Sequence, residues 1–146
     1  MANPDVRRDF AIKYVNEGLM QGYLAYVDGN VIGWCNANTR NDCLHCFGWK
    51  YHIANWKIDR KSKDKIKSIF CFTIAPDMRG QGVATELLER VIDDAKKDGY
   101  KYVESYPNKE NTDMYYNYVG PEELYRKLGF ELYTETKWRL VLRKKL

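Results

Sequence analysis

Hydrophobic residues recur along the chain with two different periods, and the order of these periods predicts where helices and strands lie. Over residues 4–16 a spacing of four predicts a helix that ends at Gly18 and has one apolar side: Val6, Phe10 and Tyr14. A stronger helical stripe ends at Gly99 and is formed by Val83, Leu87, Leu88, Val91, Ile92 and Ala95. A third helix is expected over residues 120–129.

Alternating and fully apolar runs predict the strands. Residues 22–27 and 31–36 flank Asp28-Gly29-Asn30, a turn sequence that tolerates positive φ, and therefore predict a β-hairpin. Residues 66–74 become apolar on both faces, which is typical of a central strand. We expect one face of this strand to carry Ile66, Ser68, Phe70, Phe72 and Ile74, and the other to carry Ile69, Cys71 and Thr73.

The last third of the chain predicts three more strands. Residues 101–106 predict a short strand that Pro107 closes, and residues 130–134 and 137–143 predict a closing hairpin with Trp138, Leu140 and Leu142 on one face. Residues 37–64 show no clean period. The complete order predicts an α/β fold in which helices pack against one sheet, in a single domain over residues 1–146.

Composition and charge narrow the class of protein. A chain that is 45% apolar and 30% charged is typical of a folded globular domain, and no run approaches the length of about 18 apolar residues that a membrane span needs. The start of the chain has no apolar signal segment, so we expect a cytoplasmic protein with reduced cysteines and no membrane partner. A formal charge of +4 favours an anionic ligand but gives little support to a nucleic-acid partner.

The most informative segment runs from Ile74 to Ala84, where a predicted buried strand enters a loop that becomes a helix. The first helical N–H groups lack acceptors within the helix, Gly80 and Gly82 let the backbone approach an anion, and Arg79 adds a positive charge. A plain glycine turn remains an alternative. A Walker phosphate-binding loop is excluded, because Val83 stands where that loop needs lysine. A dinucleotide-binding fold is also disfavoured, because too little chain follows this segment to supply its further strands.

The same segment resembles the signature of the GNAT superfamily of N-acetyltransferases, which reads Arg or Gln, two residues, Gly, one residue, then Gly or Ala, here Arg79, Gly82 and Ala84. Residues 124–130 resemble the family's later helix, which ends in Leu-Gly-Phe, and the resemblance covers about residues 20 to 143. It implies a mostly antiparallel sheet with one parallel pair, acetyl-CoA as co-substrate without a metal, and acetylation of a primary amine on a small molecule or protein.

The resemblance also implies positions for the acyl donor. Backbone groups of the central strand would contact its pantetheine arm, with an oxyanion donor near Ile74, and the glycine loop would hold its pyrophosphate. Asn108 follows a strand where family members often have an asparagine that touches the cofactor, although ordinary turn chemistry explains it as well. The expected set is Phe72, Thr73, Ile74, Arg79, Gly80, Gln81, Gly82, Val83, Ala84 and Asn108.

Two residues are candidates for proton transfer. By resemblance, Tyr125 would protonate the departing thiolate, and the alternative is a tyrosine of the core. Glu104 shares a strand face with Tyr102 and Tyr106, where partial burial would raise the pKa of its carboxyl group and suit it to act as a base. A solvated glutamate and a relay of water molecules remain alternatives.

Several features stay open at this stage. Cys43 and Cys46, with His45 and His52, are compatible with zinc, but a second ligand pair is missing, so no metal site is expected. The aromatic and basic residues of 47–61 are typical of a substrate-facing loop or, less so, of an RNA-associated domain. Family members usually begin with a strand and one or two helices, whereas one helix fits before Gly22, so we expect that element to be missing. A silent acetyl-CoA-binding module and a homodimer also remain open.

Overall fold

The computed structural model describes residues 3–43, 63–110 and 117–146. The helices are α1 (Pro4–Asn16), α3 (Val83–Lys97) and α4 (Glu122–Lys127), with 3₁₀ turns η1 (Arg40–Cys43) and η2 (Pro76–Met78). The strands are β1 (Gly22–Val27), β2 (Asn30–Thr39), β3 (Ile66–Ile74), β4 (Tyr102–Ser105), β5 (Glu131–Glu135) and β6 (Leu140–Lys145). Each helix and strand predicted from the sequence is therefore present, with ends that differ by a few residues.

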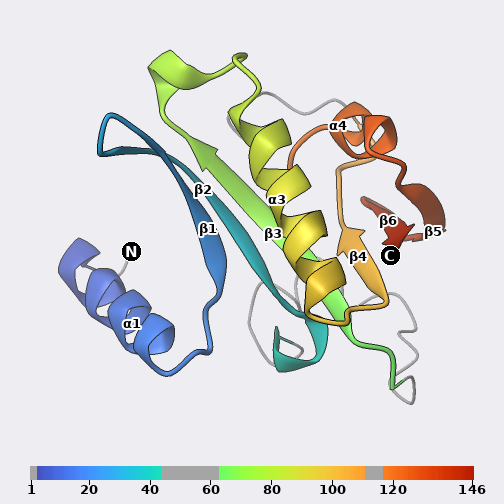
Figure 1. Cartoon of the computed structure of the whole chain (residues 1–146), viewed down its shortest axis with the longest axis horizontal. Coiled ribbons are helices and arrows are strands. Elements are labelled where there is room, and N and C mark those ends of the chain that lie inside the picture. Colours follow the sequence, from blue (N-terminus) through green and yellow to red (C-terminus); the bar gives the residue numbers. More distant parts are fainter. Residues whose placement is uncertain (1–2, 44–62, 111–116) are drawn as a thin grey trace.

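The six strands form one mixed sheet in the order β1-β2-β3-β4-β6-β5 (Figure 1). Neighbouring strands are antiparallel except for β3 and β4, which are parallel. The long connection between these two strands contains α3, as the crossover of a parallel pair requires. The predicted α/β fold with one parallel pair is confirmed.

Local sequence explains the ends of several elements. The side chain of Asn3 accepts the amide N–H of Asp5 at 3.0 Å and caps α1, as residues of this type do. In the β1–β2 turn, Asp28 and Gly29 have φ of 48° and 79°, which are the left-handed conformations of the expected tight turn.

The two faces of β3 differ from the simple alternation that the sequence predicts. The pairing with β2 shifts between Asn36 and Ala37. Asn36 pairs with Cys71 and Ala37 pairs with Ile69, so Phe70 is the extra residue of a bulge. A bulge reverses the alternation of side chains, and Ile69 and Phe72 consequently belong to the same core cluster. The prediction that these two residues lie on opposite faces was wrong.

The second correction concerns the closing hairpin. Leu140 and Leu142 are buried in β6, but Trp138 lies in the turn before it and is 63% exposed. The strand starts three residues later than the sequence pattern suggested, because Thr136 and Arg139 close the turn through backbone and hydroxyl hydrogen bonds. Trp138 therefore contributes no core face.

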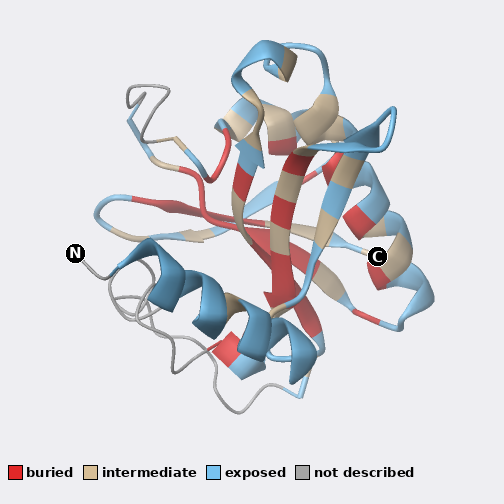
Figure 2. Cartoon of the chain, turned by 90° about the vertical axis from the view of Figure 1, so that its left-hand side faces the viewer, coloured by how far each residue is buried: buried red, intermediate tan, exposed pale blue. Residues whose placement is uncertain are grey.

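The core lies between the sheet and one side of α3. The buried side of α3 consists of Leu87, Leu88, Val91 and Ala95, and it packs against Cys35, Ala37, Ile69, Val103 and Leu142 of the sheet. In contrast, α1 stands beside the β1 edge and contains no buried residue (Figures 1 and 2). Within the described ranges, no helix has both the length and the apolar character needed to cross a membrane.

The parallel strands β3 and β4 stay paired over only part of β3. Their register runs from Ile66 opposite Tyr102 to Ile69 opposite Ser105, and β3 then continues without β4 to Ile74. In this part of β3, which β4 does not pair, the amide N–H of Phe72 donates to the carbonyl of Tyr118 at 2.6 Å, in the segment that precedes α4. The strands thus diverge, and the gap between them opens toward the glycine loop.

Candidate functional site

The loop between β3 and α3 presents unbonded backbone groups. Gly80 and Gly82 have φ of 72° and 87°, a conformation that other residues adopt only with strain. Gly82 is the N-cap of α3, and no side chain caps this end of the helix. The first N–H groups of a 15-residue helix therefore point out of the loop with the positive end of the helix dipole behind them.

Two adjoining cavities lie in front of this loop. One of about 270 Å³ is lined by Gly80, Gly82 and the first turn of α3, and one of about 350 Å³ extends along Phe72, Thr73 and Ile74 to the segment before α4. They share five lining residues: Ile74, Arg79, Ala84, Pro121 and Leu124. We call this continuous space the donor cleft. Arg79 is exposed at its mouth, where its Nε donates to the carbonyl of Ile74 at 3.1 Å.

Nine of the ten predicted donor-binding residues lie at this cleft or in the loop that borders it. Gln81 belongs to the loop, but its side chain donates to the carbonyl of Asp77 and lines a different groove. Asn108 lies elsewhere, in a bridge with Arg139 and beside a cavity of about 160 Å³ that Lys109, Glu110, Lys137 and Trp138 also line. The structure therefore brings Asn108 to the β5–β6 turn and not to the donor cleft.

Two buried polar atoms near the divergence have no hydrogen-bond partner, namely the hydroxyl of Ser105 and the side-chain oxygen of Asn117. Asn117 lines the donor cleft, and Ser105 is the last residue of β4 that pairs with β3. Buried polar atoms are normally paired, so these two mark positions that a bound molecule can complete. Sequence reasoning missed both, because neither residue belongs to a recognisable motif.

Tyr125 is completely buried within the core cluster. Its hydroxyl donates a short hydrogen bond to the carbonyl of Val119, and its ring packs edge-on against Phe130 with centroids 5.3 Å apart. Burial raises the pKa of the Tyr125 phenol well above its ordinary value, and the nearby thiols Cys35 and Cys71 add to this effect. The phenol is therefore protonated, but its hydroxyl is turned toward Val119 and does not line the donor cleft.

Glu104 is also completely buried, on the face of the sheet opposite α3. One carboxylate oxygen accepts the hydroxyl of Tyr106 at 2.7 Å, and the other accepts Nε of Arg143 in a short hydrogen bond and lies 3.6 Å from Nη1 of Arg40. The prediction from the sequence was that Glu104 is partly buried among the phenols of Tyr102 and Tyr106. The structure adds two guanidinium groups, and these stabilise the charged carboxylate. The role of Glu104 as a base stays a prediction.

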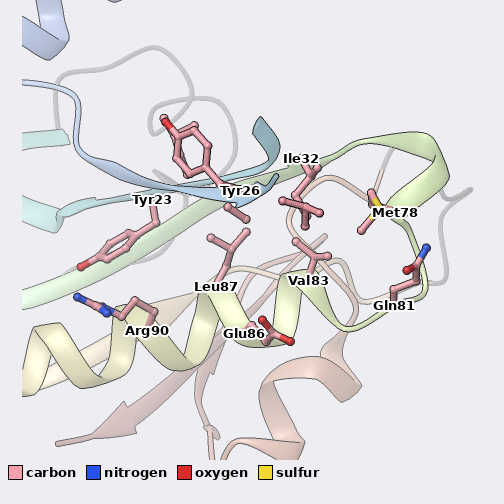
Figure 3. Close-up of a pocket in the computed structure, with 12 residues that line it drawn as sticks. Tyr23, Tyr26, Ile32, Met78, Gln81, Val83, Glu86, Leu87 and Arg90 are labelled. Atoms are coloured by element: carbon pink, nitrogen blue, oxygen red, sulfur yellow. The ribbon is translucent and has the colours of Figure 1, made fainter. Parts of the chain in front are cut away.

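A third cavity, of about 360 Å³, lies between β1 and α3, and Figure 3 shows Tyr23 and Arg90 at one end and Met78 and Gln81 at the other. Burial, together with Asp94, raises the pKa of Tyr23 to about 12. This groove lies next to the glycine loop but on the other side of α3 from Pro121 and Leu124 of the donor cleft.

The zinc alternative cannot be followed further, because Cys46, His45 and His52 lie outside the described residues. Within the described ranges, no three histidine, cysteine or acidic side chains come together as a metal site. The substrate-facing loop predicted over residues 47–61 also lies outside the described residues.

The mixed sheet with one diverging parallel pair beside a glycine-bearing loop defines the class of fold. A family model described as the acetyltransferase (GNAT) family matches residues 3–130, and the chain belongs to this family. An uncharacterized N-acetyltransferase of Methanocaldococcus jannaschii is 36% identical over 80 residues. This alignment covers 53% of the chain and only 31% of that relative's length.

Solved structures share the fold at low sequence identity. A ribosomal-protein-alanine N-acetyltransferase from Brucella melitensis superposes with a TM-score of 0.62 at 15% identity, over 99% of this chain and 80% of that one. A putative acetyltransferase from Salmonella typhimurium, solved with its cofactor acetyl-CoA, gives 0.61 at 16% identity, over 99% and 75% of the two chains. These similarities confirm the predicted family fold.

Proposed function

We propose that the protein is an acetyl-CoA-dependent N-acetyltransferase that transfers an acetyl group to a primary amine. The observation that carries this proposal is the donor cleft, which joins an uncapped helix N-terminus to the gap between two diverging parallel strands. Such a helix end binds phosphate groups, and an extended arm fits along an unpaired strand edge. Bound in this way, acetyl-CoA supplies an activated acetyl thioester.

The residues of the cleft suit such a molecule. The backbone of residues 80–84 and the guanidinium group of Arg79 would bind the pyrophosphate, because both supply donors or positive charge to an anion. The amide N–H of Ile74 points away from β2, since that of Ala75 bonds to Ile32 and strand amides alternate, so it would serve as the oxyanion donor. The unpaired side-chain oxygen of Asn117, which lines the cleft, would accept an amide N–H group of the arm.

Tyr125 would act as the general acid in this proposal. The raised pKa of its phenol keeps the proton in place until a stronger base develops nearby. In the structure this hydroxyl bonds to Val119, and the amide of Phe72 bonds to Tyr118. Both groups become available to a bound donor only if residues 118–119 move.

The same two hydrogen bonds favour a second candidate, a module that binds acetyl-CoA without turnover. If residues 118–119 keep their contacts when acetyl-CoA binds, the acid has no access to the departing thiolate. Release of free thiol on a panel of primary amines distinguishes the two functions, because only the enzyme releases coenzyme A.

The binding test compares the wild-type protein with two variants by thermal unfolding with and without acetyl-CoA. We expect acetyl-CoA to raise the Tm of the wild-type protein, as a ligand specific for the folded state does. Arg79→Ala should weaken binding by about tenfold, because charge-assisted hydrogen bonds are typically stronger than neutral ones by a factor of about two. Arg90→Ala, which changes an arginine on the other side of α3, should leave binding unchanged. If acetyl-CoA does not raise the Tm of the wild-type protein, both candidate functions are wrong.

The acid is tested by Tyr125→Phe, which keeps the ring and removes the hydroxyl. We expect the rate of thiol release to fall about 100-fold or more, since a positioned acid contributes typically about 10² to 10⁴. Tyr26→Phe is the control, because its ring is 58% exposed and lies at the β1 edge. An unchanged rate in Tyr125→Phe would remove this tyrosine from the mechanism.

A homodimer and a cytoplasmic location complete the proposal. The exposed apolar side chains concentrate on α1 and the β1–β2 hairpin: Val6, Phe10, Ile12, Tyr14, Val15, Leu19, Leu24, Tyr26, Val27 and Val31. A second copy would cover such a surface, and sedimentation at several protein concentrations tests this. The free thiols of Cys35 and Cys71 suit a reducing compartment.

A further inference from the structure

The polar face of the sheet holds a cluster of charge around Glu104, and its arginines have no role in the proposed chemistry. It consists of Arg40, Ser68, Glu104, Tyr106 and Arg143, and we call it the buried charge cluster. Its members come from η1, β3, β4 and β6 and from the residue after β4, so it crosses the sheet where β3 and β4 separate. We infer that Arg40 binds a carboxylate carried by the acceptor amine.

The charges of the buried charge cluster do not balance. Two guanidinium groups, which stay protonated in proteins, face the single carboxylate of Glu104. Within the described part of the chain, neither arginine forms an ion pair with any other carboxylate. Among the described residues, the cluster therefore holds one more positive than negative charge, and Arg40 lies where an unpaired charge is costly.

Arg40, and not Arg143, carries the excess positive charge. Arg143 is satisfied, because it bonds to Glu104 and its guanidinium carbon lies 3.4 Å from the centroid of the Tyr133 ring. Arg40 is only 2% exposed, yet its Nε and Nη1 have no hydrogen-bond acceptor in the part of the chain that the structure describes. The nearest oxygen of Glu104 lies 3.6 Å from Nη1 of Arg40, which is an ion-pair distance but too long for a hydrogen bond. Buried donors without acceptors are rare in proteins and point to a missing anion.

An anion bound to Arg40 would lie on the face of the sheet opposite the donor cleft. Glu104, to which Arg40 is paired, directly precedes Ser105, the last residue of β4 that is in register with β3. The donor cleft occupies the side of the divergence toward α3 and α4, and Glu104 faces the opposite side, since its neighbour Val103 packs in the α3 core. If the acyl donor fills the cleft, the acceptor must approach through the other face, past Arg40.

The size of the excess charge favours a carboxylate over a phosphate group. One uncompensated positive charge matches a carboxylate with one negative charge, whereas a phosphate monoester carries about −1.5 to −2 at neutral pH. The acceptor is therefore an amine that also carries a carboxylate, such as a free amino acid. This conclusion about the acceptor rests on the proposed transferase function, but the binding of a carboxylate by Arg40 does not.

The test uses two matched probes, N-acetylglycine and its uncharged twin N-acetylglycinamide, with acetate as the smallest anion. The ¹⁵N-labelled wild-type protein is titrated while the Nε–H resonance of Arg40 is followed, after its assignment through the side chain. We expect N-acetylglycine to shift this resonance to saturation, with a Kd at least tenfold lower than that of N-acetylglycinamide. An unmoved resonance with N-acetylglycine and acetate, or equal shifts with both twins, would overturn the inference.

A thermal assay gives a second readout that needs no turnover. N-acetylglycine should raise the Tm of the wild-type protein and of Arg126→Met, which changes an exposed arginine of α4, but not that of Arg40→Met. A rise of equal size in folded Arg40→Met would show that the carboxylate binds elsewhere. If acetyl-CoA fails to stabilise the protein while Arg40 still binds N-acetylglycine, the proposed transferase function fails and the carboxylate site stands.

Discussion

The two faces of the sheet at the β3–β4 divergence are built from opposite kinds of side chain. Toward α3, Ile69 and Val103 pack against Leu88 and Val91 in a core that is fully buried and apolar. On the other face lies the buried charge cluster, in which Arg143 is half-buried and the other members are buried. Apolar burial stabilises a fold without further requirements, whereas buried charges cost free energy unless each is paired. Selection for stability alone therefore accounts for the first face but not for the second.

The comparison also explains a division of labour in the proposed mechanism. The donor cleft lies on the α3 side and offers mainly backbone groups of the glycine loop and β3, which suit any molecule with the same phosphates and arm. The opposite face offers side chains, and side chains determine which acceptor is bound. We expect substitutions on the two faces to separate stability, donor binding and acceptor choice.

The largest effect is expected from Glu104→Gln, which removes the carboxylate that buried Arg40 and half-buried Arg143 share. Two uncompensated guanidinium groups should lower the free energy of unfolding by about 3–5 kcal/mol. Urea denaturation measures this change. Glu89→Gln, on the exposed side of α3, is the control and should change stability by less than about 0.5 kcal/mol. Equal stability in both variants would mean that Glu104 does not balance the cluster.

On the apolar face, Leu88→Ala should destabilise the protein by about 3 kcal/mol, since Leu88 is completely buried and its truncation leaves a cavity. The matched control is Leu132→Ala on β5, because Leu132 is 49% exposed. Calorimetry or urea denaturation gives the two values. A folded Leu88→Ala variant should still bind N-acetylglycine at Arg40, and loss of that binding would show that the two faces are not independent.

A smaller effect, with a distinct dependence on pH, is expected from Tyr106→Phe. At neutral pH the variant loses the hydrogen bond to Glu104, at a cost of about 2 kcal/mol. Burial, together with the charge of Glu104, raises the pKa of Tyr106 well above its ordinary value. Its contribution to stability is therefore complete below the unfolded pKa of about 10 and is lost as the pH rises beyond it.

The difference in stability between wild-type protein and Tyr106→Phe should consequently stay constant below about pH 9 and shrink as the pH rises from about 10 to about 11. Tyr26→Phe, at an exposed ring, provides the control and should show no such trend. A difference that stays constant over this range would show that Tyr106 ionises equally in the folded and unfolded states.

Local sequence signals predicted most of the fold, and long-range packing explains what they missed. The Asp28-Gly29 turn, the Gly82 entry to α3 and the apolar stripe of α3 depend on neighbours in the sequence, and all three are confirmed. The bulge at Phe70 and the late start of β6 depend on register with another strand, which periodicity does not contain.

The same reasoning applies to the candidate site. The glycine loop is contiguous in sequence and was found, whereas Arg40 and Arg143 reach Glu104 from separations of 64 and 39 residues and carried no local signal. Glu104 itself was noted from its strand neighbours, but its partners could not be. A buried charge becomes visible as a functional residue only when all the groups around it are known.

A crystal structure with coenzyme A and N-acetylglycine tests the central claim most directly. The account predicts the pyrophosphate at the backbone amides of residues 80–84, the pantetheine arm along Phe72–Ile74, and the carboxylate within hydrogen-bonding distance of Arg40 on the opposite face. Coenzyme A in the groove between β1 and α3 of Figure 3, or a carboxylate bound away from Arg40, would contradict it.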